Sequence, residues 1–117
     1  MAYQFSRIPK KVETLSTEHR IIKTEIPCSG TKDVLDKLDE YESRSMHGQI
    51  PILWDSAKDF NIFDIKGNKF IDFTSAIFFS NIGHSNTRVT STMQEMLNKP
   101  ILGCYAYGNE VRQRYLK

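Results

Sequence analysis

The fold is decided by the stretch Phe60–His84, which reads FNIFDIKGNKFIDFTSAIFFSNIGH. Two short apolar and aromatic runs, Asn61–Ile65 and Lys69–Phe73, flank its central turn. Asp64 suits the first position of a type I turn, because its carboxylate can accept hydrogen bonds from backbone N–H groups two residues on. Gly67 suits the fourth position, where the backbone must pass through positive φ. The pattern therefore predicts a β-hairpin whose type I turn is closed by a glycine bulge.

Side chains alternate between the two faces of this hairpin. One face is apolar throughout and predicts a covering element; its members are Phe63, Ile65, Ile71 and Phe73. The opposite face mixes carboxylates with apolar side chains; its members are Ile62, Asp64, Phe70 and Asp72. After the hairpin the chain stays apolar through Ala76–Phe79, breaks at Ser80–His84 and restarts as a helix.

Length and composition limit the kinds of protein that this chain can be. At 117 residues the chain is long enough for one domain and short for two. Its hydrophobic content of 39% is ordinary for a globular protein, and its net charge of +2 comes from interspersed charges. A nucleic-acid-binding domain usually clusters its basic residues, so no nucleic-acid partner is expected. No stretch reads as a signal peptide or a membrane span, so we expect a cytoplasmic protein without a membrane partner.

The cysteine and histidine residues are dispersed along the chain. Cys28 and Cys104 are far apart, which favours a reducing compartment or buried apolar roles over a disulfide framework. The three histidines, His19, His47 and His84, are also single. No metal site is therefore expected.

Before the hairpin, residues 1–30 show no clear period and predict an extended arm that lies over another part of the structure. Within the arm, Ser16–Ile22 is compatible with a short turn of helix. Thr31 is a plausible N-cap, and apolar residues then recur at helical spacing, which predicts a helix of about three turns.

A third strand and two further helices complete the predicted elements. Ile52–Trp54 reads as a strand entering the hairpin, with a turn at Asp55–Asp59, and Pro51 keeps this strand off a central position. Asn86 can cap one helix and Asn109 another, with an apolar, aromatic connector from residue 101 to 107 between them. The chain ends inside the last amphipathic helix, which predicts that it is the front of a longer protein.

Two polar features have simple structural explanations. His84 is best explained as a histidine that bonds the backbone where Gly83 lets the chain turn, because no carboxylate or nucleophile is specified nearby. Asp64 and Asp72 fit turn and solvent-face roles better than a catalytic carboxylate pair.

From about Ile21 to Lys117 the sequence resembles the N-terminal segment of class III aminotransferases, the pyridoxal-phosphate enzymes of fold type I, and most of all their 4-aminobutyrate branch. Five pieces match in the family's order: Lys23-Thr24-Glu25-Ile26-Pro27, Glu42-Ser43-Arg44-Ser45, Pro51-Ile52-Leu53-Trp54-Asp55 with Ala57-Lys58, Asp64-x-x-Gly67-Asn68-x-Phe70-Ile71-Asp72-Phe73-x-Ser75, and Asn81-x-Gly83-His84-Ser85-Asn86. Together they are in register over most of the chain. Two departures are Thr87, where the family often has Pro, and Ala76, where Gly is common.

The resemblance implies an α+β fold in two parts. Residues 1–30 would be the arm. Residues 31–117 would supply a helix, a three-stranded antiparallel β-meander or hairpin and further helices of the small domain, stopping before the cofactor-binding large domain. Ile77 and Phe78 would be substrate-binding positions in the pocket wall, with Phe79–Asn81 as the adjoining turn. An aromatic side chain at a bend is as often core, so both explanations of Phe78 stay open.

The resemblance also implies pyridoxal 5'-phosphate as the cofactor of the complete enzyme. Its Schiff-base lysine and the carboxylate that pairs with the pyridine nitrogen belong to later parts of such proteins, and no position here matches them. We therefore assign no catalytic, cofactor-binding or metal-binding residue, and we do not expect this chain alone to transaminate. The complete enzyme would be a homodimer that moves an amino group between an amine or amino acid and a 2-oxo acid.

An alternative of another class is a stand-alone, non-catalytic protein-interaction module. In that case the apolar hairpin face and the aromatic connector would bind a partner protein.

Overall fold

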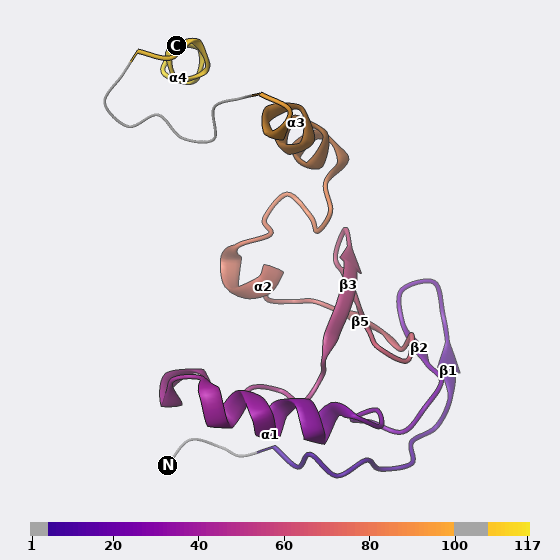
Figure 1. Cartoon of the computed structure of the whole chain (residues 1–117). Coiled ribbons are helices and arrows are strands. Elements are labelled where there is room, and N and C mark those ends of the chain that lie inside the picture. The colour runs from indigo at the N-terminus through magenta and orange to yellow at the C-terminus, as the bar shows by residue number, and fades with distance from the viewer. Residues whose placement is uncertain (1–4, 100–107) are drawn as a thin grey trace. The chain divides into compact units, whose positions relative to one another are not determined.

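The computed structural model describes residues 5–99 and 108–117, and its elements are drawn in Figure 1. By internal contacts the chain forms two units, residues 1–84 and residues 85–117, which are described separately. The first unit combines helices with a five-stranded antiparallel sheet of strand order β1-β2-β5-β4-β3. The expected α+β class is confirmed, and the three-stranded meander gains two short strands.

The hairpin at the heart of the sheet forms as the sequence predicts. β4 (Asn61–Asp64) pairs with β5 (Lys69–Ile71). In the turn, Gly67 has a φ of 73° and its N–H donates to the Asp64 carbonyl at 2.9 Å. The Asp64 carboxylate accepts from the Lys66 N–H, also at 2.9 Å. The type I turn with a glycine bulge is therefore confirmed.

A buried asparagine ties the arm to this turn. Asn68 is 0% exposed, and its amide oxygen accepts from the N–H groups of Lys23 (2.7 Å) and Thr24 (3.2 Å). Its amide nitrogen donates to the Thr24 hydroxyl (2.8 Å) and to Asp64 Oδ2 (2.7 Å). Protein groups therefore fill all the hydrogen-bonding positions of this side chain.

Two short strands form within the predicted arm. β1 (Leu15–Ser16) pairs with β2 (Ile21–Ile22), and β2 pairs in turn with β5. The helical turn considered for Ser16–Ile22 is wrong, because the Thr17 N–H donates to the Arg20 carbonyl at 2.8 Å and closes a tight turn between strands. The edge of β5 supplies ladder hydrogen bonds that outweigh the local helical preference of so short a segment.

Helix α1 (Thr31–Tyr41) has the length expected from its periodicity. Its N-cap is Gly30 at a φ of 89°, not Thr31. Thr31 is the first helical residue, and its buried hydroxyl lies 3.4 Å from the Cys28 sulfur. Glycine adopts the left-handed conformation at little cost, so the threonine side chain can pack inward. A short 3₁₀ helix, η1 (Arg44–Met46), follows in the polar loop.

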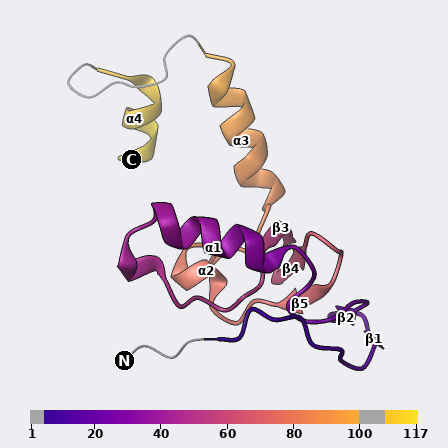
Figure 2. The same cartoon turned by 60° about the horizontal axis from the view of Figure 1, so that its bottom comes forward.

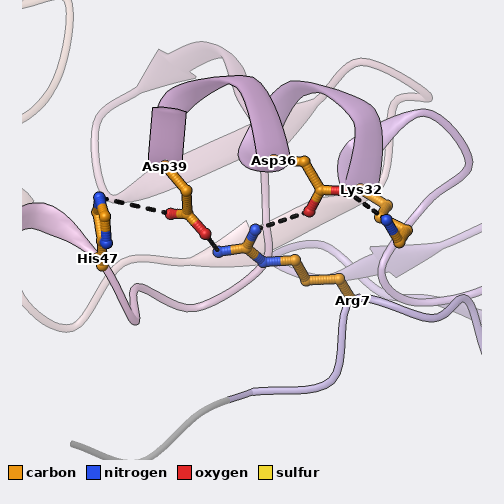
Figure 3. A network of polar contacts seen from close by, with 5 residues as sticks. All are labelled: Arg7, Lys32, Asp36, Asp39 and His47. Carbon is orange, nitrogen blue, oxygen red and sulfur yellow. Dashed lines mark hydrogen bonds and ion pairs between the residues drawn. The ribbon is translucent and has the colours of Figure 1, made fainter. Parts of the chain in front are cut away.

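In Figure 1 the described part of the arm runs along α1, and Figure 2 shows the same elements turned by 60°. A network of ion pairs joins the arm to α1 (Figure 3). Arg7 donates to Asp36 at 2.9 Å and to Asp39 at 2.7 Å. Lys32 pairs with Asp36 one turn away on the same helix, and His47 Nε2 lies 3.9 Å from Asp39. Two of the four carboxylates of the helix, those of Asp36 and Asp39, are thus engaged with the arm.

β3 (Trp54–Lys58) forms an edge of the sheet, as Pro51 indicated. The strand predicted at Ile52–Trp54 begins only at Trp54, and the turn predicted at Asp55–Asp59 is wrong, because residues 55–58 belong to β3, which pairs with β4. The chain turns only at Asp59, which has a φ of 54°, and Phe60. Polar residues are tolerated here because an edge strand presents one side to solvent.

The apolar core of the first unit is small. Among the described residues, the buried apolar side chains are Ile22, Cys28 and Ile62, together with those of Pro27 and Pro51. The apolar hairpin face stays largely uncovered, with Ile71 36% and Phe73 90% exposed. Buried residues lie on the opposite face of the hairpin, where Asp64 is 3% exposed. The turn role predicted for Asp64 is confirmed, and its bonds within the turn and to Asn68 enclose the side chain instead of leaving it facing solvent.

The second unit contains α3 (Thr87–Leu97) and α4 (Glu110–Tyr115). Asn86 caps the first helix and Asn109 the second. Each asparagine side chain accepts from two N–H groups at the start of its helix, at 2.9–3.4 Å. Both predicted caps are confirmed.

The predicted connector from residue 101 to 107, with Cys104 inside it, lies outside the described residues. Cys28 is a free thiol whose burial raises its pKa above the usual range. No helix within residues 5–99 or 108–117 is long and apolar enough to cross a membrane.

Candidate functional site

The candidate substrate-binding residues Ile77 and Phe78 lie on α2 (Ser75–Phe78), a single turn that follows the hairpin. All four residues of this turn have positive φ, between 50° and 67°. The turn is therefore left-handed, and the Phe78 N–H closes it by donating to the Thr74 carbonyl at 2.8 Å. None of the four residues is a glycine, so no turn signal in the sequence indicates this handedness.

A left-handed backbone is costly for residues that carry a Cβ atom, at roughly 1–2 kcal/mol for each residue. Ile77 is an especially unfavourable residue for this conformation because it is β-branched. Ala76 stands where the resembled family often has glycine, and its φ of 50° explains why glycine suits the position. Such strain persists only where the surrounding structure fixes the backbone.

The Asp72 carboxylate accepts several of the hydrogen bonds that hold the backbone of this turn in place. Oδ1 accepts from the Thr74 N–H (2.8 Å) and from the Thr74 hydroxyl (2.7 Å). Oδ2 accepts from the Ala76 N–H inside the turn, at 2.8 Å, and is also 2.8 Å from His84 Nε2. The Asp72 side chain is only 3% exposed, so the solvent-face role expected for it is wrong.

The hydrogen bonds to Asp72 control its protonation. Burial by itself would raise the pKa of this carboxyl, but the bonds from His84, Thr74 and Ala76 outweigh burial and hold the pKa well below its usual range. Asp72 is therefore an ionised acceptor near neutral pH, and His84 must carry a proton on Nε2 to donate to it.

His84 joins this carboxylate to the edge of the sheet. Its backbone forms an antiparallel bridge with Asp59, with N–H to carbonyl distances of 2.9 and 2.7 Å. Its ring meets Trp54 of β3 edge to face, with centroids 5.6 Å apart. The predicted backbone role of His84 is confirmed, but the expectation that it lacks a carboxylate partner is wrong, because the fold brings Asp72 to it.

Gly83 has the conformational role predicted for it. Its φ is 90°, and an added Cβ would lie 3.4 Å from Asp59 Cα. The glycine therefore allows both the turn and the close approach of the bridge to the end of β3.

The turn presents its apolar side chains to the surface. Ile77, Phe78 and Phe79 are 72%, 78% and 89% exposed within the chain. Beside the turn lies a hollow of about 290 Å³ whose lining includes Asp72, Ser75, Ser80, Asn81 and His84. Ile77 and Phe78 do not line it. The core explanation of Phe78 therefore fails for the described part of the chain, while a role toward substrate stays a prediction.

A second hollow, of about 490 Å³, lies between the arm and α1. The polar residues Arg7, Asp39 and His47 line it and already face one another. Among the residues that the structure describes, no lysine side chain is buried. The described part of the chain thus provides no enclosed amine that fits a Schiff base with pyridoxal phosphate.

Curated proteins similar to the chain are aminotransferases. The 5-aminovalerate aminotransferase of Pseudomonas putida is 39% identical over 59 residues, which cover 50% of this chain and 14% of that protein. Mitochondrial ornithine aminotransferase of Arabidopsis thaliana is 26% identical over 84 residues, covering 72% and 18% of the two chains. The diaminobutyrate–2-oxoglutarate transaminase of Sporosarcina pasteurii is 29% identical over 89 residues, covering 74% and 21%.

A solved structure shows the same fold. Acetylornithine aminotransferase from Elizabethkingia anophelis superimposes with a TM-score of 0.66 at 23% identity, over 75% of this chain and 22% of that one. No family model matches the chain.

In sequence the chain is similar to part of several class III aminotransferases, and it shares its fold with part of an acetylornithine aminotransferase. The resemblance found in its motifs is confirmed at this level. The chain spans about a fifth or less of the length of these curated relatives. The matches give no support to the alternative of a stand-alone interaction module.

Sequence reasoning missed the pairing of Asp72 with His84. The two residues are twelve positions apart and on different segments. The available signal was that both belong to motifs matched with the family, one in the hairpin piece and one in the Gly83-His84 piece.

Proposed function

We propose that the chain is the N-terminal part of a pyridoxal-phosphate-dependent aminotransferase of class III. The complete protein would move an amino group between an amine or amino acid and a 2-oxo acid, as a cytoplasmic homodimer. Its arm would comprise residues 1–30 and its small-domain segment residues 31–117. The similarity to several aminotransferases over half or more of the chain is the observation that carries this proposal.

Pyridoxal phosphate, when bound by the complete protein, supplies an electron sink at the carbon that carries the amino group. The residues that hold it would lie outside this chain. We propose that this chain contributes Ile77 and Phe78 as part of the wall of the substrate pocket. Exposed within the chain, their side chains can exclude water and select the donor by the size of its side chain.

The test uses the protein produced from its own reading frame. It should show the visible absorbance of bound pyridoxal phosphate and transfer amino groups from at least one amine or amino acid to a 2-oxo acid. Absence of both would contradict the proposal.

The wall residues are tested with Phe78→Ala and Ile77→Ala. A change of this size in an apolar pocket should alter the preference between donors of different chain length by roughly 10-fold. Phe73→Ala removes another highly exposed aromatic ring, from outside the turn, and is the matched control. Unchanged donor preference in both wall variants would contradict the assignment of these residues while leaving the aminotransferase assignment intact.

A further inference from the structure

We propose that Asp72 and His84 form a clamp that fixes the left-handed turn, and that both are positioning residues for the wall formed by Ile77 and Phe78. The effect of the clamp on substrate rests on the proposed function. Its effect on the turn does not.

The contacts of the Asp72 carboxylate are distributed around the turn. It accepts from Thr74 just before α2, from Ala76 inside α2 and from His84 after it. A carboxylate offers about four acceptor positions, and these contacts occupy four. One buried side chain thus connects the entrance, the interior and the exit of the same turn.

His84 anchors Asp72 to the sheet. Its backbone is bridged to Asp59 at the end of β3, and its ring contacts Trp54 on that strand. The contacts therefore run from the sheet through His84 to Asp72, and from Asp72 to the Ala76 N–H.

The turn depends on such bonds because its own side chains contribute little packing within the chain. Ile77 and Phe78 are each more than 70% exposed. Their backbone is in a conformation that isoleucine and phenylalanine do not favour. Release of the clamp should let the turn relax to negative φ and displace both side chains.

Four variants test the clamp in the protein produced from its own reading frame. Asp72→Asn places an amide N–H₂ group against donors at Ala76 and His84. His84→Phe keeps a ring beside Trp54 but removes the donor. His84→Gln keeps a donor near the position of Nε2 and is the conservative variant. Asp36→Asn alters an aspartate that is bonded to Arg7 and Lys32 on α1, and it is the control.

Two measurements are made on each variant. Amide hydrogen exchange in the segment from residue 75 to 80 should accelerate at least about 10-fold in Asp72→Asn and His84→Phe, and stay near wild type in the other two. For the donor with the longest side chain, KM should rise about 10-fold while kcat changes less than about 3-fold, because wall placement affects binding more than chemistry.

Each outcome decides a separate point. Accelerated exchange together with the KM effect, both restored in His84→Gln, supports the proposal. Unchanged exchange in both Asp72→Asn and His84→Phe overturns the clamp, whatever the activity. Accelerated exchange with unchanged KM values overturns the positioning role and leaves a purely structural one. A wild-type protein without amino transfer overturns the proposed function, and exchange then still decides whether the pair holds the turn.

Discussion

At the scale of single residues, two positions combine unusual conformation or burial with complete hydrogen bonding. Asn68 is enclosed and satisfied by the arm and by Asp64. Ala76 sits at positive φ, and its N–H is held by Asp72. In the first case loss of the side chain should destabilise the fold, and in the second loss of a methyl group should stabilise it.

Asn68→Ala should increase local opening of the arm. The change leaves two backbone N–H groups and one Asp64 oxygen without their partner, which costs about 2–4 kcal/mol. Hydrogen exchange of the Lys23 and Thr24 amides measures this opening. Asn81→Ala, at an exposed asparagine, should change exchange little. Equal effects of the two variants would show that the Asn68 bonds do not hold the arm.

Ala76→Gly should stabilise the protein by about 1 kcal/mol, because glycine adopts positive φ without the Cβ clash. The matched control is Ala57→Gly in β3, where a regular strand makes glycine unfavourable by roughly 0.5–1 kcal/mol. Urea unfolding gives both free energies, and the two changes should have opposite signs. Destabilisation by Ala76→Gly would contradict the left-handed assignment of the turn.

At the scale of elements, turns and helix caps could be predicted from neighbouring residues, whereas contacts between residues distant in sequence could not. The turn between β4 and β5 and the cap of α3 follow from Asp64, Gly67 and Asn86, whose partners lie within four residues. The strands of the arm depend on the distant edge of β5, and α2 depends on a histidine several residues beyond it. No short window of sequence contains both members of such a contact.

The left-handed turn should loosen in acid. Because the pKa of folded Asp72 lies below its ordinary value of 3.8, the unfolded state takes up a proton first as pH falls. The stabilisation by ionised Asp72 is complete above about pH 5 and is lost progressively below it. The other ionisable groups near this carboxylate are His84, which donates to it, and Asp59, which lines the same hollow. Hydrogen exchange of residues 75–80 against pH, compared between wild type and Asp72→Asn, should show an acid limb only in wild type.

The attachment of the arm to α1 can be tested at Arg7. Arg7→Ala removes the bonds to Asp36 and Asp39, which are partly exposed, so global stability should fall by no more than about 1 kcal/mol. Limited proteolysis within the arm should nevertheless become faster. Lys11→Ala, at an exposed lysine of the same arm, is the control. Unchanged proteolysis in Arg7→Ala would contradict the fastening role of the network.

At the scale of the whole molecule, the described residues include many more exposed large apolar side chains than buried ones. Within the first unit only five apolar residues among the described ones are buried, two of them prolines, while Phe73, Ile77, Phe78 and Phe79 are each more than 70% exposed. Exposed apolar patches of this kind usually meet other polypeptide. They are consistent with the proposed place of the chain in a larger enzyme.

The 117-residue chain by itself should therefore self-associate or fold poorly. Light scattering coupled to size-exclusion chromatography at two protein concentrations measures this directly. We expect species larger than a monomer whose share rises with concentration. A monomer with a sharp, reversible thermal transition would contradict the expectation and favour an independent module.

The handedness of α2 has a consequence for chemical synthesis. Left-handed backbone is the natural preference of mirror-image amino acids, since the steric rule that penalises L-residues is reversed for them. D-alanine at position 76 would match the observed φ as well as glycine does, and it would not add glycine's freedom to the unfolded chain. A turn whose shape the sequence does not indicate is thus a place where this chain readily accommodates a residue of opposite chirality.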